Sequence, residues 1–163
     1  SSETKNVYLP LQFKEGSPIH PSWTAGHAAV AGAAVTVMKA MLECHEKQEN
    51  TYVSKNWPGD ILVPEISDGN STLVEKTSES NITIVGELNK LASNVSLGRD
   101  FAGVHYRCDG TCGLFIGEEY AISYLIDLAK EFHESQINLF DGWILEKFDG
   151  TLIKITAKGA KNL

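Results

Sequence analysis

The pattern of hydrophobic positions along the chain predicts three helices. The first runs from about Ala25 to Cys44, in an alanine-rich segment whose small residues allow close packing, and Ser22 or Thr24 can cap its start. The second runs from Thr83 to about Val104, where apolar side chains recur every three to four residues. The third runs from about Asp109 to Glu134. The pattern is typical of a mainly α protein.

Three intervals lack this helical periodicity. Residues 1–24 are rich in proline and are expected to form an irregular lead-in. Residues 46–81 are polar and punctuated by Pro58-Gly59 and Asp68-Gly69, which predicts a long loop within the helical core of residues 25–134. Residues 135–163 alternate apolar and polar positions around two Asp-Gly pairs, which predicts short β strands and a small C-terminal hairpin appendage.

Composition narrows the class of protein. The chain has 163 residues, of which 42% are hydrophobic and 21% are charged, as is usual for a soluble globular domain. It has no apolar run long enough to predict a membrane span, and its first ten residues lack the apolar core of a signal peptide. The net charge of −7 and the lack of a basic stripe argue against nucleic acid as a partner. Three cysteines fit no disulfide framework of a small secreted domain.

Several conspicuous residues receive structural interpretations. The pair Glu118-Glu119 is expected on a solvated helix face, and His45 and His133, near predicted helix ends, are expected at the surface. The three tryptophans are expected to be packing residues: Trp23, Trp57 and Trp143.

Arg99, His105 and Asp109 form the first candidate functional group. His105 and Asp109 are four positions apart, so on a helix they would share a face. A carboxylate there can accept one imidazole N–H and leave the other nitrogen as a ligand or nucleophile. Gly98 and Gly103 bracket the segment and indicate a helix break that lets His105 point into a site. The alternative is a surface ion pair between Arg99 and Asp109, with His105 in the core.

The stretches HPSWTAGHAAVAGAA and GRDFAGVHYRCDG together carry a family resemblance. Pro21-x4-Gly26-His27 and Arg99-x5-His105-x3-Asp109 resemble two signature motifs, Pro-Ser-Gly-His and Ser-Arg-x5-His-x3-Asp. These belong to the superfamily shared by vanadium-dependent haloperoxidases and type-2 phosphatidic acid phosphatases. From about residue 9 to residue 155 the chain is similar to the C-terminal region of algal and cyanobacterial vanadium bromoperoxidases.

The resemblance implies a vanadate site. His105 matches the histidine bound to vanadium, and Asp109 matches the aspartate that supports this histidine. Arg99 matches an arginine that hydrogen-bonds vanadate oxygens, a bidentate role that suits a guanidinium. Gly26 matches a glycine whose backbone N–H contacts vanadate at a helix start. The implied cofactor is therefore vanadate, with vanadium in the +5 state.

Two further histidines match catalytic residues of the family. His27 matches the acid–base histidine, and His20 matches another pocket histidine near the place of halide oxidation. The implied reaction is oxidation of bromide or iodide by hydrogen peroxide to a hypohalite-level agent, which halogenates a small organic acceptor.

The chain also departs from the family pattern. Ala25 stands where the motif has serine, which removes one hydroxyl donor, and Gly98 replaces the serine before the arginine. The first family motif, Lys-x6-Arg-Pro, has no counterpart here, and family members are far longer. The resemblance thus predicts a homo-oligomer or a chain completed by an N-terminal portion. Two alternatives stay open: a phosphatase with His105 as nucleophile and His27 as acid, or an inactive fragment that contributes an assembly surface.

Overall fold

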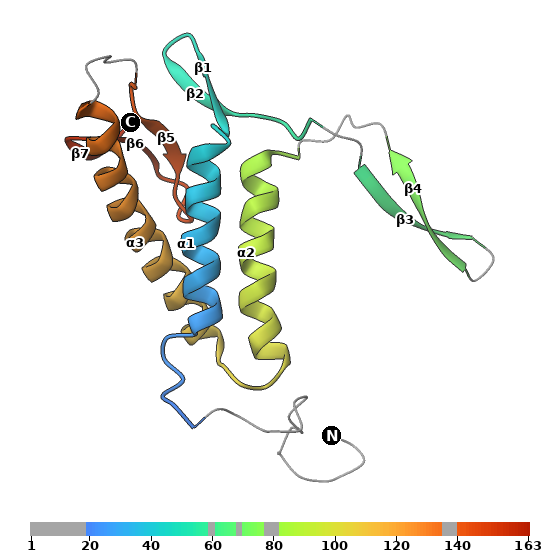
Figure 1. The fold of residues 1–163 in the computed structure, drawn as a ribbon. Coiled ribbons are helices and arrows are strands. Elements are labelled where there is room, and N and C mark those ends of the chain that lie inside the picture. Colours follow the sequence, from blue (N-terminus) through green and yellow to red (C-terminus); the bar gives the residue numbers. More distant parts are fainter. Residues whose placement is uncertain (1–18, 59–60, 68–69, 77–81, 135–139) are drawn as a thin grey trace.

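Three helices lie side by side in the computed structural model (Figure 1). They are α1 (Gly26–Met41), α2 (Ile84–Phe101) and α3 (Arg107–Glu134), and α1 packs against both of the others. The predicted mainly α class is therefore confirmed. The structure describes residues 19–58, 61–67, 70–76, 82–134 and 140–163, so most of the expected lead-in lies outside it.

Glycines bring α1 and α3 into backbone contact. A Cβ atom at Gly117 would collide with the carbonyl oxygen of Ala29, and one at Gly32 would collide with that of Leu114. A Cβ at Gly113 would lie 2.8 Å from the carbonyl oxygen of Ala25. Only hydrogen fits at these three positions, so the small-residue pattern of the sequence does produce close helix packing.

The C-terminal strands form a three-stranded antiparallel sheet in the order β5-β6-β7. Its strands are β5 (Trp143–Glu146), β6 (Leu152–Thr156) and β7 (Gly159–Asn162). Gly150, at φ 84°, follows Asp149 in the turn between β5 and β6. Alternate residues of β5 and β6 point onto α3 and form one apolar core with it: Ile122, Leu125, Ala129, Trp143, Leu145, Ile153 and Ile155.

The expected long loop over residues 46–81 is wrong, because this interval holds two β-hairpins. They are β1 (His45–Gln48) with β2 (Thr51–Ser54), and β3 (Ile61–Ser67) with β4 (Asn70–Lys76). The strands of the first hairpin are polar, which concealed them, whereas β3 begins with the apolar run Ile-Leu-Val that the prediction passed over. The Asp-Gly pair between β3 and β4 was the usable signal, because such pairs are preferred in two-residue hairpin turns.

The start of α1 also differs from the expectation. Ala25 is the N-cap residue and no side chain caps the helix, so the predicted cap by Ser22 or Thr24 is wrong. A helix start leaves several backbone N–H groups without helical partners. Among the described residues, no side chain caps those of α1, which matters for the site described below.

The tryptophan prediction holds for one residue of three. Trp143 is buried in the apolar core, but Trp23 and Trp57 are 63% and 43% exposed. In the part of the chain that the structure describes, no helix combines the length and apolarity needed to cross a bilayer.

A buried ionic group, the Lys39–Glu118 cluster, joins α1, α3 and the sheet. The Lys39 ammonium donates to the carbonyl oxygen of Glu146 at 3.0 Å and lies 4.3 Å from the ring centre of Phe148. Glu118 accepts a 2.6 Å hydrogen bond from the Phe148 N–H. Both Lys39 and Glu118 are fully buried, and burial lowers the pKa of Lys39 and raises the pKa of Glu118. The expectation of a solvated Glu118 is therefore wrong.

His45 extends this polar core to the first hairpin. Its side chain is 2% exposed, and Nε2 lies 3.3 Å from both Glu146 Oε2 and Ser54 Oγ. Serine and carboxylate meet the same ring nitrogen, so the group lacks the order of a catalytic triad, in which each contacts a different nitrogen. The surface position expected for His45 is wrong, and the His133 side chain lies outside the described part.

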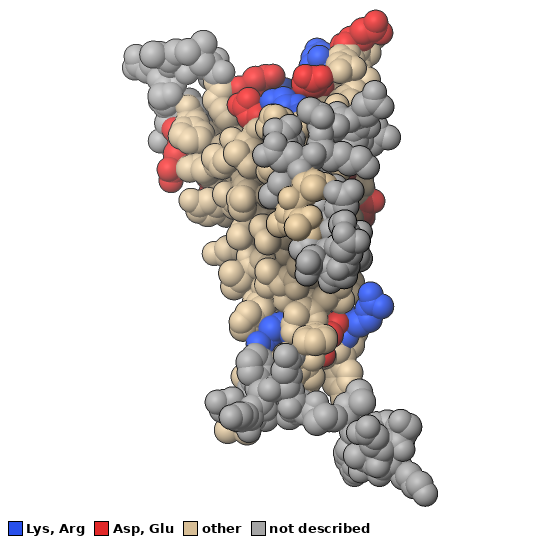
Figure 2. Space-filling model, turned by 90° about the vertical axis from the view of Figure 1, so that its right-hand side faces the viewer, with Lys and Arg blue, Asp and Glu red and all other residues tan. Residues whose placement is uncertain are grey.

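Charged side chains gather at the two ends of the bundle. Figure 2 shows the side of the molecule that carries α2, where the surface between the charged ends is mostly uncharged. Leu91 and Val95 of α2 are 50% and 37% exposed. The Lys39–Glu118 cluster lies near the C-terminal end of α1, and the predicted site residues lie at the other end.

Candidate vanadate site

Three helix ends meet at the end of the bundle opposite the Lys39–Glu118 cluster. Here α1 and α3 begin and α2 ends (Figure 1). The N–H of Ala25 donates a 3.2 Å hydrogen bond to the carbonyl oxygen of Asp109, which ties the start of α1 to the first turn of α3. The positive ends of two helix dipoles therefore lie next to each other, an arrangement that favours a bound anion.

The end of α2 sets the position of His105. Gly103 adopts φ 76°, and its N–H donates to the Asp100 carbonyl oxygen at 2.9 Å. The N–H of Val104 donates to the Arg99 carbonyl oxygen at 3.2 Å. These two bonds make a Schellman motif, which requires a left-handed residue and explains the glycine. The predicted break at Gly103 is confirmed, whereas Gly98 lies within α2.

The start of α3 positions Asp109. The Asp109 carboxylate accepts the Tyr106 N–H at 3.0 Å, as an acidic residue does at the third position of a capping box. His105 thus occupies a short connection between one helix end and one helix start, both determined by local sequence. Such a doubly anchored connection holds the imidazole in place.

His105 and Asp109 meet in this connection, although His105 precedes α3 rather than lying on it. His105 Nδ1 is 3.4 Å from Asp109 Oδ2, within ion-pair range and longer than most hydrogen bonds. Each side chain is 4% exposed. With Nδ1 directed at the carboxylate, Nε2 on the other edge of the ring is the atom left for a ligand.

Gly26 and His27 are the first residues of α1, and both are exposed. A Cβ atom at Gly26 would meet no atom within 4 Å, so the space over this backbone is open. Buried Ala25 offers no hydroxyl to the first turn. The backbone N–H groups of this turn are therefore available to an outside acceptor. Arg99, half-buried in the last turn of α2, supplies a guanidinium at the same end.

The chain is similar in sequence to part of several known enzymes. No family model matches the chain. The chain is 40% identical over 147 residues to the vanadium-dependent bromoperoxidase of Corallina pilulifera, covering 90% of this chain and 22% of that protein. Identity is 39% with the Corallina officinalis enzyme over the same shares, and 37% with that of Ascophyllum nodosum, over 88% of this chain and 25% of the enzyme.

The chain is a homologue of part of the vanadium-dependent bromoperoxidases. It spans about a fifth to a quarter of the length of these relatives. The bromoperoxidase resemblance of the two histidine-bearing stretches thus extends over nine-tenths of the chain.

The donor set at this end suits an oxyanion such as vanadate. Within the described ranges, no three His, Cys, Asp or Glu side chains lie close enough to hold a metal ion together. The groups that lie at this end of the bundle are one imidazole, one guanidinium and the uncapped backbone N–H groups of α1. Guanidinium and amide N–H groups bind oxyanion oxygens. The residues of this bromoperoxidase homologue therefore fit a vanadate held through a single histidine.

His20 stands apart from this set. Its side chain is exposed, and Nδ1 donates to the carbonyl oxygen of the adjacent Pro21 at 2.8 Å. This bond leaves Nε2 of His20 as the acceptor nitrogen. Among the described residues, this bond to Pro21 is the hydrogen bond that positions the His20 ring. The structure therefore shows no contact between His20 and His105.

Three of the groups that stabilise the Asp109 carboxylate were not predicted from the sequence: the Tyr106 N–H and the side chains of Cys108 and Ser22. The Tyr106 N–H contributes most to keeping the pKa of Asp109 below its ordinary 3.8, and the side chains of Cys108, His105 and Ser22 add to this effect. The Cys108 thiol donates to Asp109 Oδ1 over 3.5 Å. The capping-box spacing could have revealed the Tyr106 bond, but nothing local indicated Ser22, which precedes Asp109 by 87 positions.

We expect Asp109→Asn to remove an acid-sensitive element of stability. The pKa of Asp109 is lower in the folded chain than its ordinary value of 3.8. The ionised carboxylate therefore contributes fully to the free energy of unfolding above pH 3.8, and this contribution is lost as the pH falls through the pKa of the folded chain. Unfolding free energies from urea titrations should therefore differ between wild type and variant at pH 7 and converge towards pH 2. Asp127→Asn, on an exposed carboxylate of α3, is the control. A constant difference across this range would contradict the assignment.

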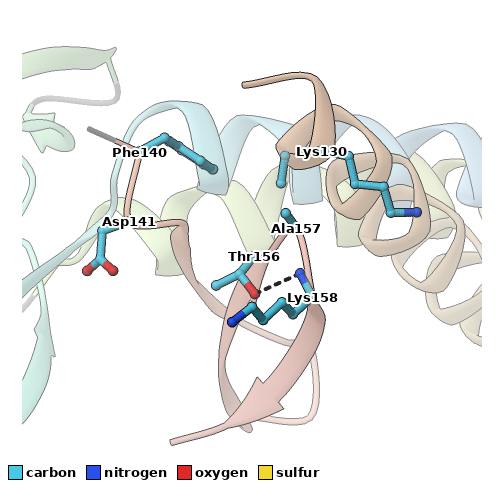
Figure 3. A pocket seen from close by; sticks show the side chains of 7 residues that line it. Lys130, Phe140, Asp141, Thr156, Ala157 and Lys158 are labelled. Atoms are coloured by element: carbon cyan, nitrogen blue, oxygen red, sulfur yellow. Dashed lines mark hydrogen bonds between the residues drawn. The ribbon is translucent and has the colours of Figure 1, made fainter. Parts of the chain in front are cut away.

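A separate hollow of about 540 Å³ lies between the end of α3 and the sheet. Figure 3 shows Lys130, Phe140, Asp141 and Lys158 around it, with the Lys158 N–H donating to Thr156 Oγ1 at 3.2 Å. None of the predicted site residues lines it. The hollow therefore has no part in the proposed chemistry.

Proposed function

We propose that this chain carries the vanadate-binding part of a vanadium-dependent bromoperoxidase. The proposed reaction is oxidation of bromide or iodide by hydrogen peroxide to a hypohalite-level agent that halogenates a small organic acceptor. The observation that supports it best is the buried His105–Asp109 pair beside the uncapped start of α1. The homologues named vanadium-dependent bromoperoxidases support the same function.

Each group has a role that follows from its position. His105 would bind vanadium through Nε2, because Nδ1 faces Asp109. Asp109 would hold the ring and its tautomer. Arg99 and the Gly26 N–H would bind vanadate oxygens and draw negative charge from them. Ala25 offers no hydroxyl, so the backbone N–H groups at the start of α1 would donate to the vanadate oxygen that the motif serine would otherwise bind.

When bound, vanadate would supply a Lewis acid that activates hydrogen peroxide towards halide. His27 would accept and return a proton during this activation, since its exposed imidazole stands at the same helix start. His20 precedes α1, and its imidazole would lie near the place where the halide is oxidised. We further propose that the working enzyme is a homo-oligomer or includes an N-terminal portion.

Vanadate binding and bromination together test this function. The chain should bind vanadate in equilibrium dialysis, with phosphate competing because the two anions share shape and charge. With bromide, hydrogen peroxide and a phenol-type dye, bromination should require vanadate. Hydrolysis of phosphate esters without bromination would support the phosphatase alternative, and absence of vanadate binding by the folded chain would support the assembly fragment.

A further inference from the structure

The first turns of α3 hold the start of α1 through contacts with both polar groups of Ala25. The Ala25 N–H donates to the carbonyl oxygen of Asp109 at 3.2 Å. One helical turn further along α3, a Cβ atom at Gly113 would lie 2.8 Å from the Ala25 carbonyl oxygen. Asp109 and Gly113 are four positions apart, so they lie on one face of α3. Because Ala25 has no side chain that could cap α1, this face of α3 supplies contacts that fix the helix start.

The same part of α3 also holds the proposed vanadium ligand. The Asp109 carboxylate lies 3.4 Å from His105 Nδ1, while the Asp109 carbonyl oxygen accepts the Ala25 N–H. Ala25 directly precedes the Gly26–His27 turn. The two halves of the proposed site are therefore both placed relative to the beginning of α3, and the close contact at Gly113 sets how near they lie to each other.

We propose that Gly113 is a positioning residue of the vanadate site. Its lack of a side chain lets the start of α1 lie directly on α3, and this contact sets the distance between the Gly26–His27 turn and His105. The inference rests on the proposed function, because it concerns the geometry of the same site. It gives Gly113 a role in placing the groups that bind vanadate, beyond close packing of two helices.

The effect of a methyl group at position 113 follows from the distances. Non-bonded atoms pack best at about 3.5 Å, so a methyl carbon at 2.8 Å would displace the Ala25 carbonyl by about 0.7 Å. This carbonyl accepts the Ala29 N–H at 3.0 Å, in the first turn of α1. The displacement would therefore loosen the turn whose backbone N–H groups are proposed to bind vanadate. A misplacement of about 1 Å can cost about 100-fold in a catalytic step.

A purely packing role for Gly113 is the alternative, and it has a different signature. The added methyl would also lie 2.9 Å from the Ala28 Cβ atom, so it would crowd the helix contact as well as the carbonyl. Replacing Ala28 by glycine in the same protein removes this second contact and returns the lost volume. The contact with the Ala25 carbonyl stays. The double variant Gly113→Ala, Ala28→Gly thus separates packing from the position of the helix start.

Vanadate binding and histidine labelling test the proposal without any activity. Equilibrium dialysis measures the vanadate affinity. Diethylpyrocarbonate labelling of exposed His27 is followed by peptide mass spectrometry, with and without saturating vanadate. In the wild type, we expect vanadate to slow labelling of His27 at least about fivefold. In Gly113→Ala and in the double variant, we expect the affinity to fall at least about tenfold and the protection of His27 to fall below about twofold.

Leu125→Ala is the control for lost stability. Leu125 is fully buried in the core that α3 forms with the sheet, so its truncation leaves a cavity and lowers the thermal midpoint. It lies 16 positions after Asp109, about 24 Å along α3. We therefore expect its vanadate affinity and its protection of His27 to stay within about twofold of the wild type. Circular dichroism shows whether each variant is folded.

Three outcomes would overturn the proposal while leaving the proposed function in place. They are unchanged vanadate affinity in Gly113→Ala, affinity and protection restored in the double variant, and an equal loss of affinity in Leu125→Ala. If Gly113→Ala does not fold, the double variant decides, because it relieves the crowding and keeps the push on the carbonyl. Failure of the folded wild type to bind vanadate would instead refute the proposed site, and this inference with it.

Discussion

Replacing His105 by alanine is expected to weaken vanadate binding by more than about 100-fold and to abolish vanadate-dependent bromination. Loss of a group that merely supports a metal ligand costs about 10- to 100-fold in affinity, so loss of the ligand should cost more. The remaining groups, Arg99 and the α1 amides, would bind vanadate as they bind any oxyanion. Equilibrium dialysis and the dye assay measure the two effects.

The matched control for this variant is His45→Ala. Both histidine side chains are almost fully buried, at 4% and 2% exposure, so both variants lose packing. His45 lies at the opposite end of the bundle, and its loss should lower stability while leaving vanadate affinity unchanged. If His105→Ala binds vanadate as tightly as His45→Ala does, the proposed vanadium ligand is wrong.

Replacing Glu118 by alanine is expected to lower the free energy of unfolding by about 3–5 kcal/mol. Both Lys39 and Glu118 are fully buried and attract each other, so removing the carboxylate leaves the Lys39 ammonium buried with less compensation. Removing the partner of a buried charge usually costs this much. The Phe148 N–H would also lose its acceptor. Because small domains are stable by only about 5–15 kcal/mol, urea denaturation followed by circular dichroism should show an early transition.

Two further variants separate charge from packing in the Lys39–Glu118 cluster. Glu118→Gln keeps an oxygen that can accept from the Phe148 N–H, so it should cost less, about 1–2 kcal/mol. The double variant Lys39→Met, Glu118→Leu should recover most of the loss, since apolar side chains can often replace two buried opposite charges without penalty. A loss below about 1 kcal/mol for Glu118→Ala would show that the cluster is hydrated rather than buried.

The two ends of the bundle thus have different roles, one in the proposed binding of vanadate and the other in the stability of the fold. At one end, His105 and Arg99 lie near the uncapped start of α1 and the start of α3, where we propose that vanadate binds. At the other end, the buried and oppositely charged Lys39 and Glu118 connect the helices to the sheet through Glu146 and Phe148. Variants at the two ends are far apart, so their effects on stability should add.

Local patterns determined much of the site. The three helices lie close to their predicted ranges because apolar periodicity reports directly on a buried helix face. Gly103 marks the end of α2, and Asp109 lies at the third position of the capping box of α3, so bonds between near neighbours in the sequence suffice to position His105. The family motifs pointed to the same residues because they contain this helix-end chemistry.

Partners distant in the sequence decided the rest. Nothing near Glu118 shows that the Phe148 N–H and Lys39 enclose it, since these lie 30 and 79 positions away. The hairpin β1–β2 was missed because its polar strands are paired through their backbones, which leave little trace in composition. The sequence by itself therefore determined the helices and the local geometry of the histidine site. Only the tertiary structure decided which charges are buried, because burial depends on contacts between segments rather than on spacing within one.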